Sequence, residues 1–188
     1  MQTYILEHAT PRRFARAEYD RMLELGFFRG EHVELIRGTL LQMAPTGPQH
    51  ASRVTALMEA FVPPLLNRAT VRVQQPFVAH DESEPAPDVA LVPFGPYAGM
   101  HPERAFLVVE VADSSLEYDR TTKAALYAES GVDEYWIVNL RDGAVEVHGA
   151  PTDGRYARIE RVTKGAMLAP LAFPDAVVPL DRLFPPAG

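Results

Sequence analysis

Apolar residues recur every three to four positions in two stretches of the chain, 13–26 and 49–66, and each stretch predicts an amphipathic helix. Gly26 is a natural stop for the first helix. The apolar positions that define the two stretches are Phe14, Ala17, Met22 and Leu25, and then Val54, Leu57, Met58, Phe61 and Leu65.

Short runs of strand-forming residues fill most of the remaining sequence. Ala105–Ala112 is apolar except for Glu110, a pattern typical of a central strand that is buried on both faces. A third helix is expected over Asp119–Ser130, with Asp119 as its cap and Gly131 at its end. The other expected strands are Val33–Ile36, Thr39–Met43, Val71–Gln75, Phe77–Ala79, Asp88–Val92, Glu134–Leu140, Ala144–Gly149 and Tyr156–Val162, with tight turns at Arg37–Gly38 and at 141–143. Together they predict an α/β domain with one mixed, twisted sheet.

The length of 188 residues suits one well-packed domain, and no repeat or linker divides it. We expect a single domain over 1–188, with an N-terminal extension at 1–12, a core at about 13–165 and a C-terminal segment at 166–188. The absence of cysteine excludes disulfides, thiolate metal sites and a thiol nucleophile. No apolar stretch approaches a membrane span and residues 1–10 lack a secretory pattern, so a cytoplasmic protein is expected.

The net charge of -7 weighs against broad, non-specific binding of nucleic acid, which requires clustered lysine and arginine. It does not exclude an enzyme that acts on nucleic acid. Carboxylates at a metal site add negative charge, and the bound cation reverses that charge locally. Only two of the 18 basic residues are lysines, Lys123 and Lys164, which makes a lysine an informative exception in this chain.

Glu110 is the strongest candidate for chemistry, because an unpaired carboxylate inside an apolar strand costs several kcal/mol. Either an ion pair with an arginine on a neighbouring element or a ligand or catalytic role would offset that cost. Asp88 opens a strand 22 positions earlier, which is enough chain for the two acids to meet across adjacent strands. Two such acids suit Mg²⁺, although a Pro-Asp pair alone also begins many ordinary turns.

Lys123 lies on the same face of its expected helix as Leu126 and Tyr127, which are three and four positions further on. A lysine ammonium can orient or activate a water beside a scissile phosphate. The alternative is a surface pair with Asp119 at the (i, i+4) spacing, worth a few tenths of a kcal/mol.

Several other polar residues have both a functional and a structural interpretation. Glu34 could be a further metal or water ligand or an exposed residue of an edge strand. His50 could bind phosphate or metal, or it could cap its helix or face solvent. Gln74 and Gln75 could contact substrate or only end a strand, whereas Tyr135 and its neighbour Trp136 are expected in the core.

In this order along the chain, these residues resemble the Uma-two family of restriction-endonuclease-like proteins, within the PD-(D/E)XK nuclease superfamily. The resemblance spans roughly residues 34–140. Its motifs are Glu34-Leu35-Ile36-Arg37-Gly38, Met43-Ala44-Pro45, His50, Pro87-Asp88-Val89, Val108-Val109-Glu110-Val111, Asp119 to Ala128, and Gly131-Val132-Asp133-Glu134-Tyr135-Trp136-Ile137-Val138.

The resemblance implies a restriction-endonuclease-like core, that is, a mixed twisted β-sheet flanked by helices, and an Mg²⁺- or Mn²⁺-dependent nuclease site. It departs from the superfamily pattern at Ala112, which stands where a lysine two positions after Glu110 is usual, so that Lys123 on the next helix replaces it. The loop Ala112–Leu116 also differs from the Leu-Ser-Pro-Ser-Thr of relatives. The implied catalytic residues are Asp88, Glu110, Lys123 and Glu34, the implied metal ligands are Asp88, Glu110 and Val111, and the implied substrate contacts are His50, Gln75 and Arg120.

The expected function is a metal-dependent endonuclease that hydrolyses DNA phosphodiesters, working by analogy as a homodimer. The alternatives are a catalytically weak binding module with the same fold, which the acidic charge and the altered loop favour, and a hydrolase of small phosphoesters. Because the net charge is negative, substrate contacts require a local basic surface. Its candidate residues are Arg72, Arg120, Arg12, Arg13 and Arg16.

Overall fold

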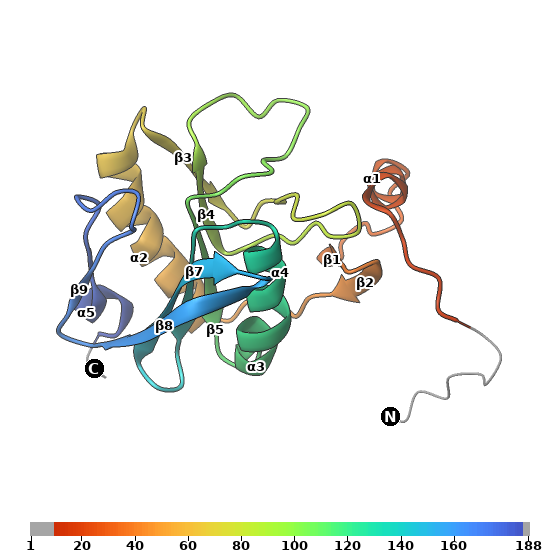
Figure 1. The fold of residues 1–188 in the computed structure, drawn as a ribbon. Helices are drawn as coiled ribbons and strands as arrows, with labels where there is room; N and C mark the ends of the chain where they lie inside the picture. Colours follow the sequence, from red (N-terminus) through yellow and green to blue (C-terminus); the bar gives the residue numbers. More distant parts are fainter. Residues whose placement is uncertain (1–9, 186–188) are drawn as a thin grey trace. The chain divides into compact units, whose positions relative to one another are not determined.

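The computed structural model describes residues 10–185, which form two compact units. The N-terminal unit comprises the described residues up to Pro45 together with His80–Pro85. The sheet unit comprises Thr46–Ala79 and the described residues from Ala86 onward (Figure 1). No helix within residues 10–185 has the length and apolar character that crossing a membrane requires.

The N-terminal unit contains one helix and one hairpin. Helix α1 (Arg16–Glu24) falls inside the stretch predicted as the first helix. Strands β1 (Val33–Ile36) and β2 (Thr39–Gln42) pair antiparallel, which confirms the predicted hairpin. The turn between them requires positive φ angles, +49° at Arg37 and +73° at Gly38, and glycine adopts such angles without strain.

The sheet unit is built on a six-stranded sheet in the order β3-β4-β5-β6-β7-β8. Strands β5 and β6 are parallel and all other neighbours are antiparallel, so the sheet is mixed, as predicted. The strands are β3 (Ala69–Val73), β4 (Val89–Pro93), β5 (Leu107–Ala112), β6 (Glu134–Asn139), β7 (Ala144–Thr152) and β8 (Arg155–Thr163). A small two-stranded sheet of β9 (Met167–Leu168) and β10 (Val178–Pro179) and helix α5 (Leu180–Leu183) follow.

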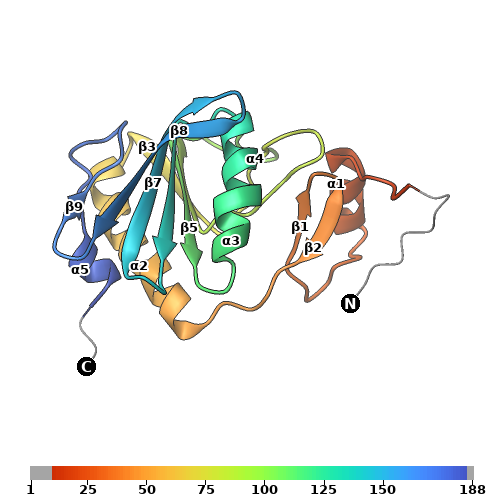
Figure 2. The same ribbon diagram turned by 60° about the horizontal axis from the view of Figure 1, so that its bottom comes forward.

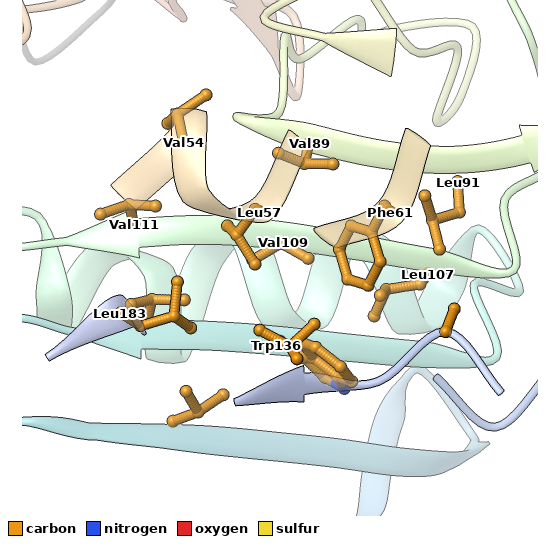
Figure 3. Close-up of a cluster of buried hydrophobic side chains, with 14 of the residues drawn as sticks. Val54, Leu57, Phe61, Val89, Leu91, Leu107, Val109, Val111, Trp136 and Leu183 are labelled. Carbon is orange, nitrogen blue, oxygen red and sulfur yellow. The ribbon is translucent and has the colours of Figure 1, made fainter. Parts of the chain in front are cut away.

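One face of the sheet packs against α2 (Pro48–Leu65) and forms the main apolar core. Alternate residues of the strands point to this face, so Leu107, Val109 and Val111 of β5 all belong to the core. Figure 3 shows Leu57 and Phe61 of α2 lying over these strands. Four of the five apolar residues that predicted α2 belong to this core, namely Val54, Leu57, Phe61 and Leu65, whereas Met58 is exposed.

The opposite face of the sheet packs against a segment made of α3 (Leu116–Tyr118), a π-helical turn (Asp119–Lys123) and α4 (Ala124–Glu129). Figure 2 shows α4 and α2 on opposite sides of the strands. The aromatic rings of Tyr127 in α4 and Tyr135 in β6 lie 5.1 Å apart on this face. Tyr135 and Trp136 are fully buried, which confirms that both belong to the core.

Two predictions of secondary structure were wrong. The third helix begins at Leu116, not Asp119, and Asp119 is not a cap: its carboxylate accepts a hydrogen bond from Ser115 Oγ at 2.6 Å inside the helical segment. Residues 77–79 are apolar but form no strand. The chain leaves the sheet at Gln74, which has a φ of +49°, and the N–H of Val78 pairs with the carbonyl of Pro102 instead of a sheet ladder.

Candidate active site

Asp88 and Glu110 face each other across β4 and β5 in the sheet unit. The antiparallel register pairs Val89 with Val109, and one further step places Asp88 opposite Glu110. The backbone N–H of Asp88 donates to Glu110 Oε2 at 3.3 Å, and the N–H of Val111 donates to Asp88 Oδ2 at 2.8 Å. Sheet geometry therefore holds the two carboxylates side by side, each hydrogen-bonded to the backbone of the other strand.

The orientation of Glu110 follows from the alternation of β5. Its neighbours Val109 and Val111 point to the α2 face, which sends Glu110 and Ala112 to the face that α4 covers. The methyl group of Ala112 is fully buried there. The position two residues after Glu110 is therefore directed to the same face as the site but carries no cation.

Lys123 supplies the cation from the helical segment. Its Nζ lies 3.2 Å from Glu110 Oε1, and the hydroxyl of Tyr127 donates to the same oxygen at 2.7 Å. Both side chains are almost completely buried. Lys123 closes the π-helical turn and Tyr127 lies one helical turn further on, so that both face Glu110. A π-helical turn inserts an extra residue into a helix and often occurs at functional sites.

Asp88 is held from two other elements. His50, in the first turn of α2, places Nε2 at 2.9 Å from Asp88 Oδ2, and Gln74 donates its Nε2 to Asp88 Oδ1 at 3.3 Å. The hydrogen bond to Asp88 raises the pKa of His50 above its ordinary value, burial opposes that shift, and the charges of Asp88 and Asp119 add to it. His50 is not the cap of α2, because Gly47 occupies that position.

The remaining sequence candidates lie in different surroundings. Glu34 belongs to the N-terminal unit and is buried there, with 2% of its surface exposed. Gln74 and Gln75 are both exposed, and of the two only Gln74 is described in contact with Asp88. Arg120 forms a two-point ion pair with Glu146 and a further pair with Glu117. Sequence reasoning placed Tyr127 on the face of Lys123 but did not assign it to the site, although its spacing of four from Lys123 could have suggested it.

The arginines expected near the N-terminus are engaged within their own unit. Arg12 pairs with Glu18, Arg13 approaches Glu82 at 3.7 Å, and Arg16 approaches Asp20 at 3.9 Å. Each pair includes a side chain with more than a third of its surface exposed, and such pairs contribute little to stability.

The donor set at Asp88 and Glu110 fits a small, hard divalent cation. Mg²⁺ typically takes one or two carboxylates and keeps its other positions for water and phosphate oxygens. A carboxylate oxygen has about two lone pairs, and among the described residues Asp88 Oδ1 accepts one hydrogen bond, from Gln74. Val111 could add only its backbone carbonyl oxygen. Within residues 10–185, no group of three or more His, Asp or Glu side chains is arranged as a metal cluster.

A family model and a solved structure both match this chain. The model of the Uma2 family, described as "Putative restriction endonuclease", matches residues 16–181. The chain is similar to a crystal structure from Anabaena variabilis described as a putative nuclease belonging to DUF820, with a TM-score of 0.69 and 16% sequence identity over 93% of this chain and 98% of the other. At that identity the likeness shows the fold alone, and it confirms the expected mixed α/β architecture. A search of curated proteins found no match.

Proposed function

This chain belongs to the Uma2 family of putative restriction endonucleases, and on that premise we propose that it is a divalent-metal-dependent endonuclease that hydrolyses DNA phosphodiester bonds. The observation that carries the proposal is the buried contact of Lys123 and Tyr127 with Glu110, directly beside Asp88. A buried lysine and two acids from separate elements are costly to assemble for structural purposes alone.

In this proposal Asp88, Glu110 and the carbonyl of Val111 hold Mg²⁺ or Mn²⁺, which supplies positive charge for the phosphate oxygens when it is bound. Lys123 hydrogen-bonds and orients the water that attacks phosphorus, since its ammonium is fixed at 3.2 Å from Glu110 Oε1. Tyr127 fixes the rotamer of Glu110, and Gln74 and His50 fix Asp88. Each supporting hydrogen bond reduces the motion that would otherwise separate the reacting groups.

The remaining sequence predictions are part of the same proposal. Glu34 acts as a further acid, and His50, Gln75 and Arg120 contact the substrate. Two copies of the chain form the active species. Sedimentation measurements with and without DNA test the homodimer, and Glu34→Gln in a cleavage assay tests the additional acid.

The decisive experiment compares cleavage of plasmid and oligonucleotide DNA by the parent protein, Asp88→Asn and Glu110→Gln, with Mg²⁺ or Mn²⁺ supplied. We expect each variant to lose at least about 100-fold in rate, the order of magnitude of losing one catalytic group. Glu160→Gln, an exposed change on β8, is the control with the same change of charge. Calorimetric titration with Mn²⁺ reports metal binding independently of cleavage.

The outcomes separate the candidate functions. If the parent protein binds DNA but cleaves none with any divalent metal, the interaction-module alternative replaces the nuclease. If it hydrolyses small phosphoesters but neither plasmid nor oligonucleotide, the substrate class is wrong. Equal cleavage by the parent protein and Glu110→Gln would contradict the assignment of the site.

A further inference from the structure

Arg72 is a buried arginine for which the described residues provide no acid. It lies in β3 with 9% of its surface exposed, and none of the carboxylates in residues 10–185 forms an ion pair with its guanidinium. Its Nε is buried and has no hydrogen-bond partner among these residues. Arginine remains charged under all ordinary conditions, so this side chain keeps a positive charge in a poorly hydrated place.

The contacts that Arg72 does make are weak compensation for that burial. One guanidinium nitrogen lies 3.4 Å from the carbonyl oxygen of Pro76 and 3.4 Å from His101 Nδ1. The guanidinium also lies over the ring of Tyr97, 5.4 Å from its centre. Burial lowers the pKa of Arg72, and among its surroundings only Tyr97 opposes that shift. A neutral carbonyl, an imidazole and an aromatic ring do not replace a counter-charge.

Arg72 is also on the same face of the sheet as the candidate active site. The register pairs Arg72 with Ala90, and the next position on that face of β4 is Asp88. Gln74, which hydrogen-bonds to Asp88, follows directly after the end of β3, two residues after Arg72. Arg72 and Ala90 form one cross-strand pair on this face of the sheet, and Asp88 and Glu110 form the next one along.

We propose that Arg72, with His101 and Tyr97, forms a subsite for a backbone phosphate of the nucleic acid strand that neighbours the scissile phosphate. This inference rests on the proposed nuclease function and adds to it the group that positions the substrate. A phosphodiester supplies the missing negative charge, and guanidinium binds phosphate through two parallel hydrogen bonds. A local positive charge of this kind can attract a phosphate group even though the net charge of the protein is negative.

The competing explanation is that Arg72 only fastens the loop 94–106 to the sheet through Tyr97 and His101. In that case replacing Arg72 would lower the stability of the protein but would not change how much each substrate phosphate contributes to the binding affinity. Measurements that count phosphate contacts therefore separate the two explanations, since a fastening role does not affect them.

The first experiment measures binding of a fluorescent oligonucleotide over a salt series, without metal so that no cleavage occurs. Arg72→Gln is expected to bind about 10-fold more weakly than the parent protein, with the salt slope reduced by about 1. Arg72→Lys keeps the charge but not the planar pair of donors, and we expect an intermediate affinity with the parent salt slope. Arg182→Gln, an exposed arginine of α5, is the matched control. Thermal unfolding checks that each variant is folded.

The second experiment uses the unmodified protein and does not depend on how the variants fold. Oligonucleotides carry one uncharged methylphosphonate that is moved stepwise along the strand. We expect one position beside the scissile phosphate at which neutralisation weakens binding by about 10-fold, and at which Arg72→Gln, if folded, shows no further loss. If every neutralised oligonucleotide binds as the natural one does, or if Arg72→Gln keeps the parent salt slope, the subsite does not exist.

Failure of this inference is distinguishable from failure of the proposed function. A parent protein that cleaves DNA while Arg72→Gln binds and cleaves equally well overturns only the subsite. A parent protein that neither binds nor cleaves DNA overturns both, because the subsite rests on the nuclease function.

Discussion

Glu110 in the sheet unit and Glu84 in the N-terminal unit are both buried, but the surroundings of the two side chains differ. In the sheet unit, Glu110 receives hydrogen bonds from Lys123, Tyr127 and the backbone N–H of Asp88. In the N-terminal unit, Glu84 is 2% exposed, and neither carboxylate oxygen has a hydrogen-bond partner among the described residues.

The difference shows two ways in which the free-energy cost of burying a carboxylate is lowered. Donors and a lysine stabilise the ionised form of Glu110, which is the form that a cation requires. Glu84 has no such donors, so burial raises its pKa to about 7, the charge of Asp20 adds to the shift and Arg16 opposes it. Glu84 therefore binds a proton near neutral pH. Burial of an acid is not by itself a sign of a metal site; the donors around it decide.

The most severe test of this comparison removes the Lys123 ammonium that contacts Glu110. Lys123→Met keeps an unbranched side chain, one atom shorter, but leaves a buried carboxylate without its cation, and we expect a loss of about 3–5 kcal/mol in the free energy of unfolding at pH 7. Urea denaturation measures it. Lys164→Met is the matched control, because Lys164 is the only other lysine and is exposed.

A double variant sharpens the same test. Glu110→Gln added to Lys123→Met removes the stranded charge, so part of the lost stability should return. If Lys123→Met is as stable as Lys164→Met, the contact at 3.2 Å does not stabilise the fold and the contrast with Glu84 is lost.

The second test acts on Glu84. Its pKa in the folded protein is about 7, above the ordinary value of 4.5, so the folded state holds the proton more tightly than the unfolded state. The contribution of Glu84 to stability is therefore fully present below pH 4.5 and is lost as the pH rises through 7. Glu84→Gln should increase the free energy of unfolding by about 3 kcal/mol at pH 8 and leave it nearly unchanged at pH 4.

Urea denaturation over this pH range checks the sign of the effect. Glu31→Gln, an exposed change in the same unit, should show no such pH dependence. A Glu84→Gln variant that is less stable than the parent at pH 8 would mean that Glu84 is ionised and stabilised in the folded protein, and the two glutamates would then be alike.

The smallest effect is expected from Tyr127→Phe. The change removes one donor, at 2.7 Å from Glu110 Oε1, while Lys123 and the backbone N–H remain. We expect a loss of about 1 kcal/mol in stability and weaker Mn²⁺ binding, because Glu110 is less firmly held. Tyr156→Phe is the comparison: its buried hydroxyl donates to the carbonyl of Val132, and its loss should leave Mn²⁺ binding unchanged.

Predictions from the sequence were most accurate where local pattern decides structure. The hairpin around Arg37–Gly38 and helix α2 follow from turn chemistry and periodicity, and both are present. The strand predicted at 77–79 was wrong, because apolar residues alone do not show whether a partner strand is available. The cap assigned to Asp119 was wrong because the segment begins at Leu116 and contains a π-helical turn that periodicity does not reveal.

The sequence by itself determined that Glu110 lies in a central strand and points with Ala112 away from Val109 and Val111, because a strand alternates its side chains whatever surrounds it. Only the tertiary structure decided what meets that carboxylate. The register of β4 against β5 brings Asp88 beside it, and the packing of the helical segment brings Lys123 and Tyr127. These contacts join residues 13 to 22 positions apart, and their geometry depends on how separate elements pack, which no local pattern specifies.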